Sequence, residues 1–293
     1  MIDFAVNITT ILNGLAYGML IYTLAVGLSL IFGMLNLLNL AHGTFFLLGA
    51  YLAATLIPPD GAWWGWLLAI AAGLAAGALG GMLLRVMTLP KASHGHMAEA
   101  LLTLGLSLGA TSIMLWTFGG EPRSIPAPQF LQGSIDIAGD PYPVYRVAVI
   151  LLGVVIAIAV ELFLERTSLG ATIRATVHDD QMVRALGIST RRIVFGVLIV
   201  GSALAAVTGV FGGPILGASQ GLDGSILLIA LVVVVLGGLG SPRGALLGAL
   251  FIGLVQNIGI ALSPHLAPFL MFAGMAIVLI FRPQGLLGKA GAH

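Results

Sequence analysis

Few residues in this sequence could do chemistry, and the most conspicuous of them are neutral. The stretch NLLNLAHG separates two long apolar runs with two amides, an imidazole and a glycine, namely Asn36, Asn39, His42 and Gly43. A second amide pair, Gln256 and Asn257, interrupts another apolar run. Amides offer hydrogen bonds rather than catalysis, and the imidazole has no nucleophile pattern or paired carboxylate within a span to complete a catalytic set. We expect these six residues to contact a polar solute or to satisfy backbone groups at a break in a helix.

Patterns for metal binding and nucleotide hydrolysis are missing. The sequence has no H-E-x-x-H pattern among its six histidines and no cysteine, so we predict no metal site and no cofactor in this chain. Lys91 and Lys289 are the only lysines, and neither ends a phosphate-binding G-x-x-x-x-G-K-[ST] loop. The chain is therefore predicted not to be an enzyme and not to hydrolyse ATP by itself.

The acidic residues bear on energy coupling. All eleven, Asp223 among them, are expected in loops or at the ends of helices. Transporters driven by protons or sodium usually hold a carboxylate in the middle of the membrane. A polar path in this chain would therefore be passive, or its energy would come from another protein.

Composition fixes the class of fold. The 293 residues are 59% hydrophobic and only 8% charged, with a mean hydropathy of +1.09. Apolar runs of roughly 20 residues, the length that crosses a bilayer, recur along the chain. We predict an all-α, polytopic helical membrane protein with about nine spans (8–10), forming one domain over residues 1–293. The predicted spans are 10–34, 40–57, 63–86, 98–118, 144–164, 192–213, 224–240, 243–262 and 266–281.

Lys and Arg fall mainly on one side of this arrangement. Of the 12 basic residues, only Arg123 and Arg146 lie on the other side. Cytoplasmic loops are the ones enriched in Lys and Arg. We therefore expect the C-terminus and loop 165–191 to be cytoplasmic, and the N-terminus and loop 119–142 to be external.

Loop 165–191 carries start and stop signals for two short helices. Ser168 is expected to cap the first, Asp179 or Asp180 to start the second, and Gly187 to end it. Met182, Val183 and Leu186 should share an apolar face of the second helix. This pattern fits a surface that docks another protein, or a helix resting on lipid headgroups, and spacing alone leaves both open. The docking interpretation rests on Arg174, Asp179, Asp180, Met182, Val183, Arg184, Leu186 and Gly187.

Two segments are expected on the outer side. Loop 119–142 is rich in Pro and Gly and should be extended or turn-like. The segment GGPILGASQGLDG, residues 212–224, has too many glycines and a proline for a regular helix. Its polar groups, Gln220 and Asp223, are predicted to stand at an outer mouth, although a plain connecting loop is the alternative.

Five segments in collinear order resemble one family. They are GLAYGMLIYTLAVGLSLIFGMLNLLNLAHGTFFLLGAYLA, LLTLGLSLGATSIMLWTFGGEPRSIP, SLGATIRATVHDDQMVRALGI, VLGGLGSPRGALLGALFIG and RPQGLLG. Together they cover nearly the whole chain. They look like the permease subunits of bacterial ABC importers of the branched-chain amino acid type, which also include urea and short-chain amide permeases. The N-x-x-H-G start of the second run and the closing RPQGLLG look more like the H-type subunit than its M-type partner.

The resemblance implies the partners that the sequence leaves out. Such a permease works in the bacterial cytoplasmic membrane with a second, related permease, two ATP-binding subunits on the inside and an external substrate-binding protein. Loop 165–191 then corresponds to the segment that couples the permease to the ATPase. The substrate would be a branched-chain amino acid or a related amino acid, amide or urea. Nothing in the sequence indicates binding of nucleic acid.

Two alternatives remain open at this stage. A self-sufficient channel for a small neutral solute such as urea would suit the same composition, but it would not need loop 165–191. At the first break, Asn39 and His42 either cap a helix beside a substrate path or belong to a plain tight turn with Asn39 as N-cap.

Overall fold

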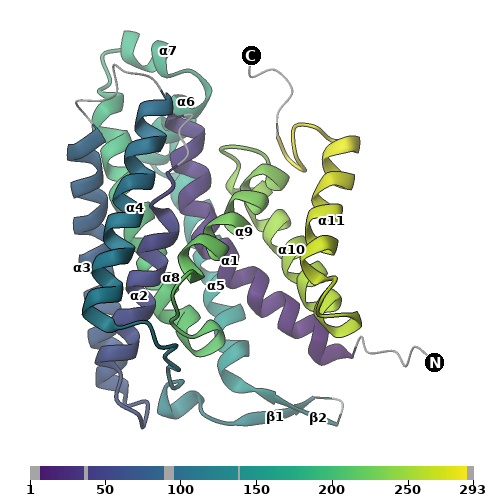
Figure 1. Cartoon of the computed structure of the whole chain (residues 1–293). Coiled ribbons are helices and arrows are strands. Elements are labelled where there is room, and N and C mark those ends of the chain that lie inside the picture. The colour runs from purple at the N-terminus through teal and green to yellow at the C-terminus, as the bar shows by residue number, and fades with distance from the viewer. Residues whose placement is uncertain (1–6, 36–38, 89–95, 138, 289–293) are drawn as a thin grey trace.

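The computed structural model of the chain describes residues 7–35, 39–88, 96–137 and 139–288, and it is a helical bundle (Figure 1). Its helices are α1 (Ile8–Leu35), α2 (His42–Leu56), α3 (Trp63–Thr88), α4 (His96–Phe118), α5 (Val144–Arg166), α6 (Ser168–His178), α7 (Asp180–Ala185), α8 (Thr190–Leu216), α9 (Leu222–Gly237), α10 (Pro242–Leu262) and α11 (Ala267–Phe281). Loop 119–142 contains a 3₁₀ turn at Gln129–Leu131 and an antiparallel hairpin of β1 (Ser134–Ile137) and β2 (Asp140–Pro143). The predicted all-α membrane fold is confirmed, with this hairpin as an unpredicted addition.

The long helices and the short ones differ in what they can do in a membrane. Six helices of the described residues are long and apolar enough to cross a bilayer: α1, α3, α4, α5, α8 and α10. The other three apolar helices, α2, α9 and α11, have 15, 16 and 15 residues. That is less than the roughly 20 residues a full crossing needs, so length does not support nine full spans.

The bundle has two distinct ends (Figure 1). The hairpin β1–β2 and the start of α1 lie at one end, which we call the hairpin end, and α6 and α7 lie at the opposite one, the α6 end. The described chain finishes at the α6 end, so its two termini lie on opposite sides of the bundle.

Helices α2 and α9 both begin part-way along the height of the bundle rather than at one of its two ends. His42, the first residue of α2, places Nε2 3.1 Å from the carbonyl oxygen of Leu24. Leu24 is about 24 Å along α1, which is roughly 42 Å long. A Cβ atom added to Gly43 would lie 2.2 Å from the backbone oxygen of Asp223, in the first turn of α9. The sequence placed residues 39–43 at the inner end of a span, but the structure places them near mid-height.

Glycine permits this internal junction and the crossing behind it. Where α2 crosses α8, a Cβ on Gly49 would lie 1.8 Å from the Ala206 oxygen, and one on Gly209 would lie 1.9 Å from the Phe46 oxygen. Because lipid gives helices little hydrophobic reason to associate, such close backbone contact supplies the packing. Gly105 and Gly109 lie four residues apart on α4, a spacing typical of close helix packing, yet an added Cβ there would meet nothing within 4 Å among the described residues.

The predicted irregular segment 212–224 is mostly helical. Helix α8 continues through Pro214 to Leu216, and only residues 217–221 separate it from α9. Pro214 lies in the last turn, where its missing N–H removes one hydrogen bond shortly before the helix ends. Gly217, with a φ of +73°, then ends α8, and Ala218 pairs with Arg123 through backbone hydrogen bonds of 2.8 and 2.9 Å.

Two alanine substitutions test the α2–α8 contact. Gly209→Ala should destabilise the isolated protein by about 1–3 kcal/mol, the usual cost of overpacking. Gly109→Ala should leave stability unchanged or raise it by up to about 1 kcal/mol, because alanine favours a helix more than glycine does. Thermal melts of both variants in detergent, followed by size exclusion, measure the difference. Equal melting of the two variants would show that the close contact is not a constraint.

Candidate functional site

The start of α2 holds buried polar groups that are only partly satisfied. Asn39 and His42 are 1% and 0% exposed. Asn39 accepts a hydrogen bond from the Ala41 N–H at 3.2 Å, and the Nε2–H of His42 donates to Leu24. Asn39 Nδ2 and His42 Nδ1 have no hydrogen-bond partner among the residues that the structure describes. Ala41, rather than Asn39, is the N-cap of α2, so the tight-turn alternative is wrong in that detail. Asn36 lies outside the described residues.

The start of α9 completes this junction from the other side. The Thr111 hydroxyl of α4 donates to Oδ2 of Asp223 at 3.1 Å. One turn earlier on α4, the Ser107 hydroxyl lies 2.7 Å from the Thr44 hydroxyl of α2. Three helices thus meet through hydroxyls, a carboxylate and Gly43. Gln220 is exposed in the turn before α9.

The predicted amides of α10 belong elsewhere. Asn257 donates to the carbonyl of Gly253, one turn earlier in its own helix, at 3.0 Å. Gly253 packs against Gly14 and Gly18 of α1, whereas His42 contacts α1 at Leu24. Ten residues of helix, from Gly14 to Leu24, correspond to about 15 Å. The structure therefore does not bring Gln256 and Asn257 together with the α2–α9 junction.

Helices α6 and α7 form where the sequence predicted two short helices. Thr167 caps α6 by accepting the Gly170 N–H at 2.9 Å, one residue before the predicted cap Ser168. Asp179 caps α7 by accepting the Met182 N–H at 2.9 Å, as expected. Gly187, with a φ of +80°, ends α7. An L-residue avoids that conformation, so glycine is the natural helix stop there.

The apolar face of α7 differs from the prediction. Met182 and Leu186 are 59% and 71% exposed, but Val183 is 3% exposed and packs inward. Adjacent residues on a helix point about 100° apart, so Met182 and Val183 cannot both face outward. The outward surface, which we call the α7 knob, consists of Met182 and Leu186, while Arg184 forms an ion pair with Asp180.

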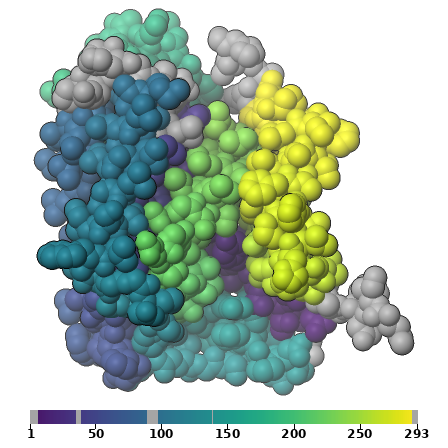
Figure 2. Space-filling view, in the orientation of Figure 1, coloured from purple at the N-terminus to yellow at the C-terminus, as the bar shows by residue number. Residues whose placement is uncertain are grey.

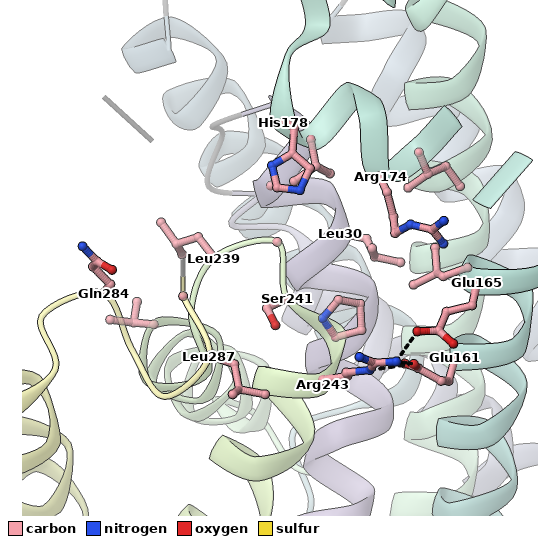
Figure 3. A pocket seen from close by; sticks show the side chains of 18 of the residues that line it. Leu30, Glu161, Glu165, Arg174, His178, Leu239, Ser241, Arg243, Gln284 and Leu287 are labelled. Carbon is pink, nitrogen blue, oxygen red and sulfur yellow. Dashed lines mark hydrogen bonds and ion pairs between the residues drawn. The ribbon is translucent and has the colours of Figure 1, made fainter. Parts of the chain in front are cut away.

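A hollow of about 570 Å³ opens beside α6 at the same end of the bundle (Figure 3). Arg243, at the start of α10, forms ion pairs with Glu161 and Glu165 of α5 along its floor. Arg174 and His178 of α6 face the same hollow. The sequence analysis missed the three ion-paired residues, because Arg243 and its partners are about eighty positions apart and nothing local connects them.

Helix α6 contacts the turn that follows α9, and the C-terminal segment is bonded to the end of α9. A Cβ atom added to Gly240 would lie only 2.8 Å from Cγ1 of Val177 on α6, so these two residues are in close contact. Gly240 also contacts Gly33 of α1. The N–H groups of Leu286 and Leu287 donate to the carbonyls of Leu236 and Gly237 at 2.7 and 3.1 Å. These bonds satisfy carbonyls at the end of α9 that the helix leaves free. The segments GGLGSPRG and RPQGLLG are therefore in direct contact.

Comparison with known proteins gives a consistent picture. A family described as "Branched-chain amino acid transport system / permease component" matches residues 10–281. The high-affinity branched-chain amino acid permease protein LivH of Salmonella typhimurium is 27% identical over 94% of both chains, and BraD of Pseudomonas aeruginosa is 27% identical over 95% of both. LivM of Escherichia coli K12 is 29% identical over 92% of this chain and 68% of its own length. No solved structure matches the chain.

Substitution of Gly285 tests the link between the C-terminal segment and α9. Gly285 has a φ of +83°, and an added Cβ would lie 2.6 Å from the Gly238 nitrogen. Gly285→Ala should therefore detach the segment and speed hydrogen exchange at Leu286 and Leu287 by at least about tenfold. Gly196→Ala, where an added Cβ meets nothing within 4 Å, is the control. Unchanged protection in the Gly285 variant would contradict the link.

Proposed function

The chain belongs to the family of branched-chain amino acid transport permeases, and we propose that it is the membrane permease subunit of an ABC importer. In this proposal it carries a branched-chain amino acid, or a related amino acid or amide, into the cytoplasm. The observation that carries the proposal is the α7 knob, which stands out from the bundle on a helix pair with defined caps. A passive channel has no use for such a rigid projection.

Partners supply what this chain lacks. Two ATP-binding subunits would dock at the α6 end, and an external binding protein would deliver substrate at the hairpin end. A second, related permease would complete the path, which agrees with the likeness of this chain to both LivH and LivM.

Charge supports this orientation. Among the described residues, two arginines, Arg123 and Arg146, belong to the hairpin end. The others belong to the side that the sequence assigns to the α6 end: Arg85, Arg166, Arg174, Arg184, Arg191, Arg192, Arg243 and Arg282. Basic residues favour the cytoplasmic side. The α6 end would therefore face the ATPase, in the bacterial cytoplasmic membrane.

The packing of α6 gives a route for the coupling. A displacement of the α7 knob moves α6, and Val177 bears on Gly240 at the turn that follows α9. Because α9 is a single helix of 16 residues, a push at its end is carried to its start beside Gly43. ATP-driven motion at the α6 end would thus open or close the α2–α9 junction.

The α7 knob is tested by Leu186→Asp. Leu186 is 71% exposed, so the variant should insert and fold normally. A carboxylate pressed into an apolar groove is costly, so recovery of the ATPase with the permease should fall by at least about tenfold, and uptake should stop. The matched control is Phe130→Asp, an equally exposed residue at the hairpin end, which should leave ATPase recovery unchanged.

The same experiment separates the importer from a passive channel. Uptake that persists in Leu186→Asp, with normal ATPase recovery, would contradict the coupling role. Uptake that continues in wild type after the ATPase is inactivated would identify a self-sufficient channel instead.

A second substitution tests the route beyond the knob. Val177→Ala removes the methyl groups that touch Gly240, and the small cavity should cost only about 1 kcal/mol of stability. ATPase binding should persist, while the amount of substrate moved per ATP hydrolysed falls. Val200→Ala, at a side chain that is 66% exposed on α8, is the control for loss of the same methyl groups. An unchanged transport-to-hydrolysis ratio in Val177→Ala would show that the motion takes another route.

A further inference from the structure

One face of the bundle exposes α9 between α4 and α11 (Figure 2). Along most of its length this exposed surface is apolar, as lipid or another membrane helix requires; Leu228 and Val235 are examples. At its start the character changes, because Gly221, Gly224 and Ser225 are exposed and Asp223 is partly exposed. We call Asp223, Ser225, Thr111 and Ser112 the Asp223 patch.

The Asp223 patch lies within the depth of the membrane. Thr111, which donates to Asp223, stands seven residues before the end of α4, or about 10 Å inside it. Gly43, at mid-height of the bundle, contacts the Asp223 backbone. The sequence analysis expected this carboxylate at an outer mouth, and the structure places it in the first turn of α9, partly exposed.

A carboxylate at this depth cannot face lipid. Asp223 forms no ion pair with any residue that the structure describes, and a charge at the centre of a bilayer costs several kcal/mol. The face must therefore meet water and protein, which a second permease across a shared path provides.

The hydrogen bonds of the patch determine what it can bind. The Ser112 hydroxyl donates to the Leu108 carbonyl at 2.8 Å, and that of Ser225 donates to Gly221 at 3.1 Å. The Thr111 hydroxyl shares its proton between the Ser107 carbonyl, at 2.9 Å, and Asp223, at 3.1 Å. Because each hydroxyl has a single proton, the patch presents lone pairs and one negative charge outward. It is built to receive a hydrogen-bond donor that carries positive charge.

We propose that Asp223 binds the ammonium group of the transported amino acid on a path between α4 and α9 of this chain and the second permease. This proposal rests on the proposed function and names the substrate group that the chain recognises. It implies that a neutral amide, which lacks the charge, gains less from the patch than an amino acid does.

The absence of cysteine from the sequence makes the surroundings of Asp223 measurable. Ser225→Cys in the assembled transporter should react with small, membrane-impermeant thiol reagents, whereas Leu151→Cys, exposed on α5, should be protected by lipid. The cationic reagent should react roughly threefold faster, and the anionic one roughly threefold slower, than in the double variant with Asp223→Asn. No reaction at Ser225→Cys, or no charge preference, would overturn the proposal.

Uptake by the reconstituted transporter provides the second test. Asp223→Asn should lower amino acid uptake at least about tenfold, with normal assembly and ATPase binding, and Asp223→Glu should restore part of it. Glu121→Gln, at an exposed carboxylate just after α4, should transport normally. Full uptake by Asp223→Asn would overturn this inference alone, whereas no amino acid uptake by wild type would overturn the proposed function.

Discussion

The close approach of α2 and α9 inside the bundle is the constraint on which the rest of the structure depends. Gly43 lies so near the Asp223 oxygen that no side chain fits between them. Backbone at membrane depth that is not part of a full span must be enclosed by protein or water. Helices α1, α4 and α8 supply that enclosure with hydroxyls, with closely packed glycines and with the Leu24 carbonyl that the buried imidazole of α2 contacts. The α2–α9 junction is therefore a cluster of hydrogen-bonding groups within an otherwise apolar bundle.

The same constraint gives the molecule a means of responding at a distance. Because α9 starts at the junction and finishes beside α6, it is one rigid element with an end at each site. The C-terminal segment holds its far end by two backbone hydrogen bonds, and Val177 presses on the following turn. In the proposed importer, where a partner would hydrolyse ATP, this element would provide the mechanical connection between the two sites.

Local signals predicted local structure well. The fold class followed from charge content, and α6, α7 and their boundaries followed from Asp179 and Gly187, whose effects act within one turn of helix. Depth was not predictable, since the apolar runs of α2 and α9 were counted as spans although the folded helices have only 15 and 16 residues. Val183 faces inward because α7 packs against the rest of the bundle on that side. Arg243 forms ion pairs with Glu161 and Glu165, which are about eighty positions away in the sequence. Neither contact produces a local sequence pattern.

The central claim is that motion at the α7 knob reaches the start of α9. Because the chain lacks cysteine, spin labels at Leu186→Cys and Ser225→Cys, each paired with a reference label at Leu151→Cys on α5, would report both ends in the assembled transporter. Distances measured by pulsed electron resonance with and without ATP test the claim directly. The account predicts that both label pairs change distance together on nucleotide binding, and that Val177→Ala removes the change at residue 225 only. A knob that moves while residue 225 stays fixed in the wild-type chain would contradict it.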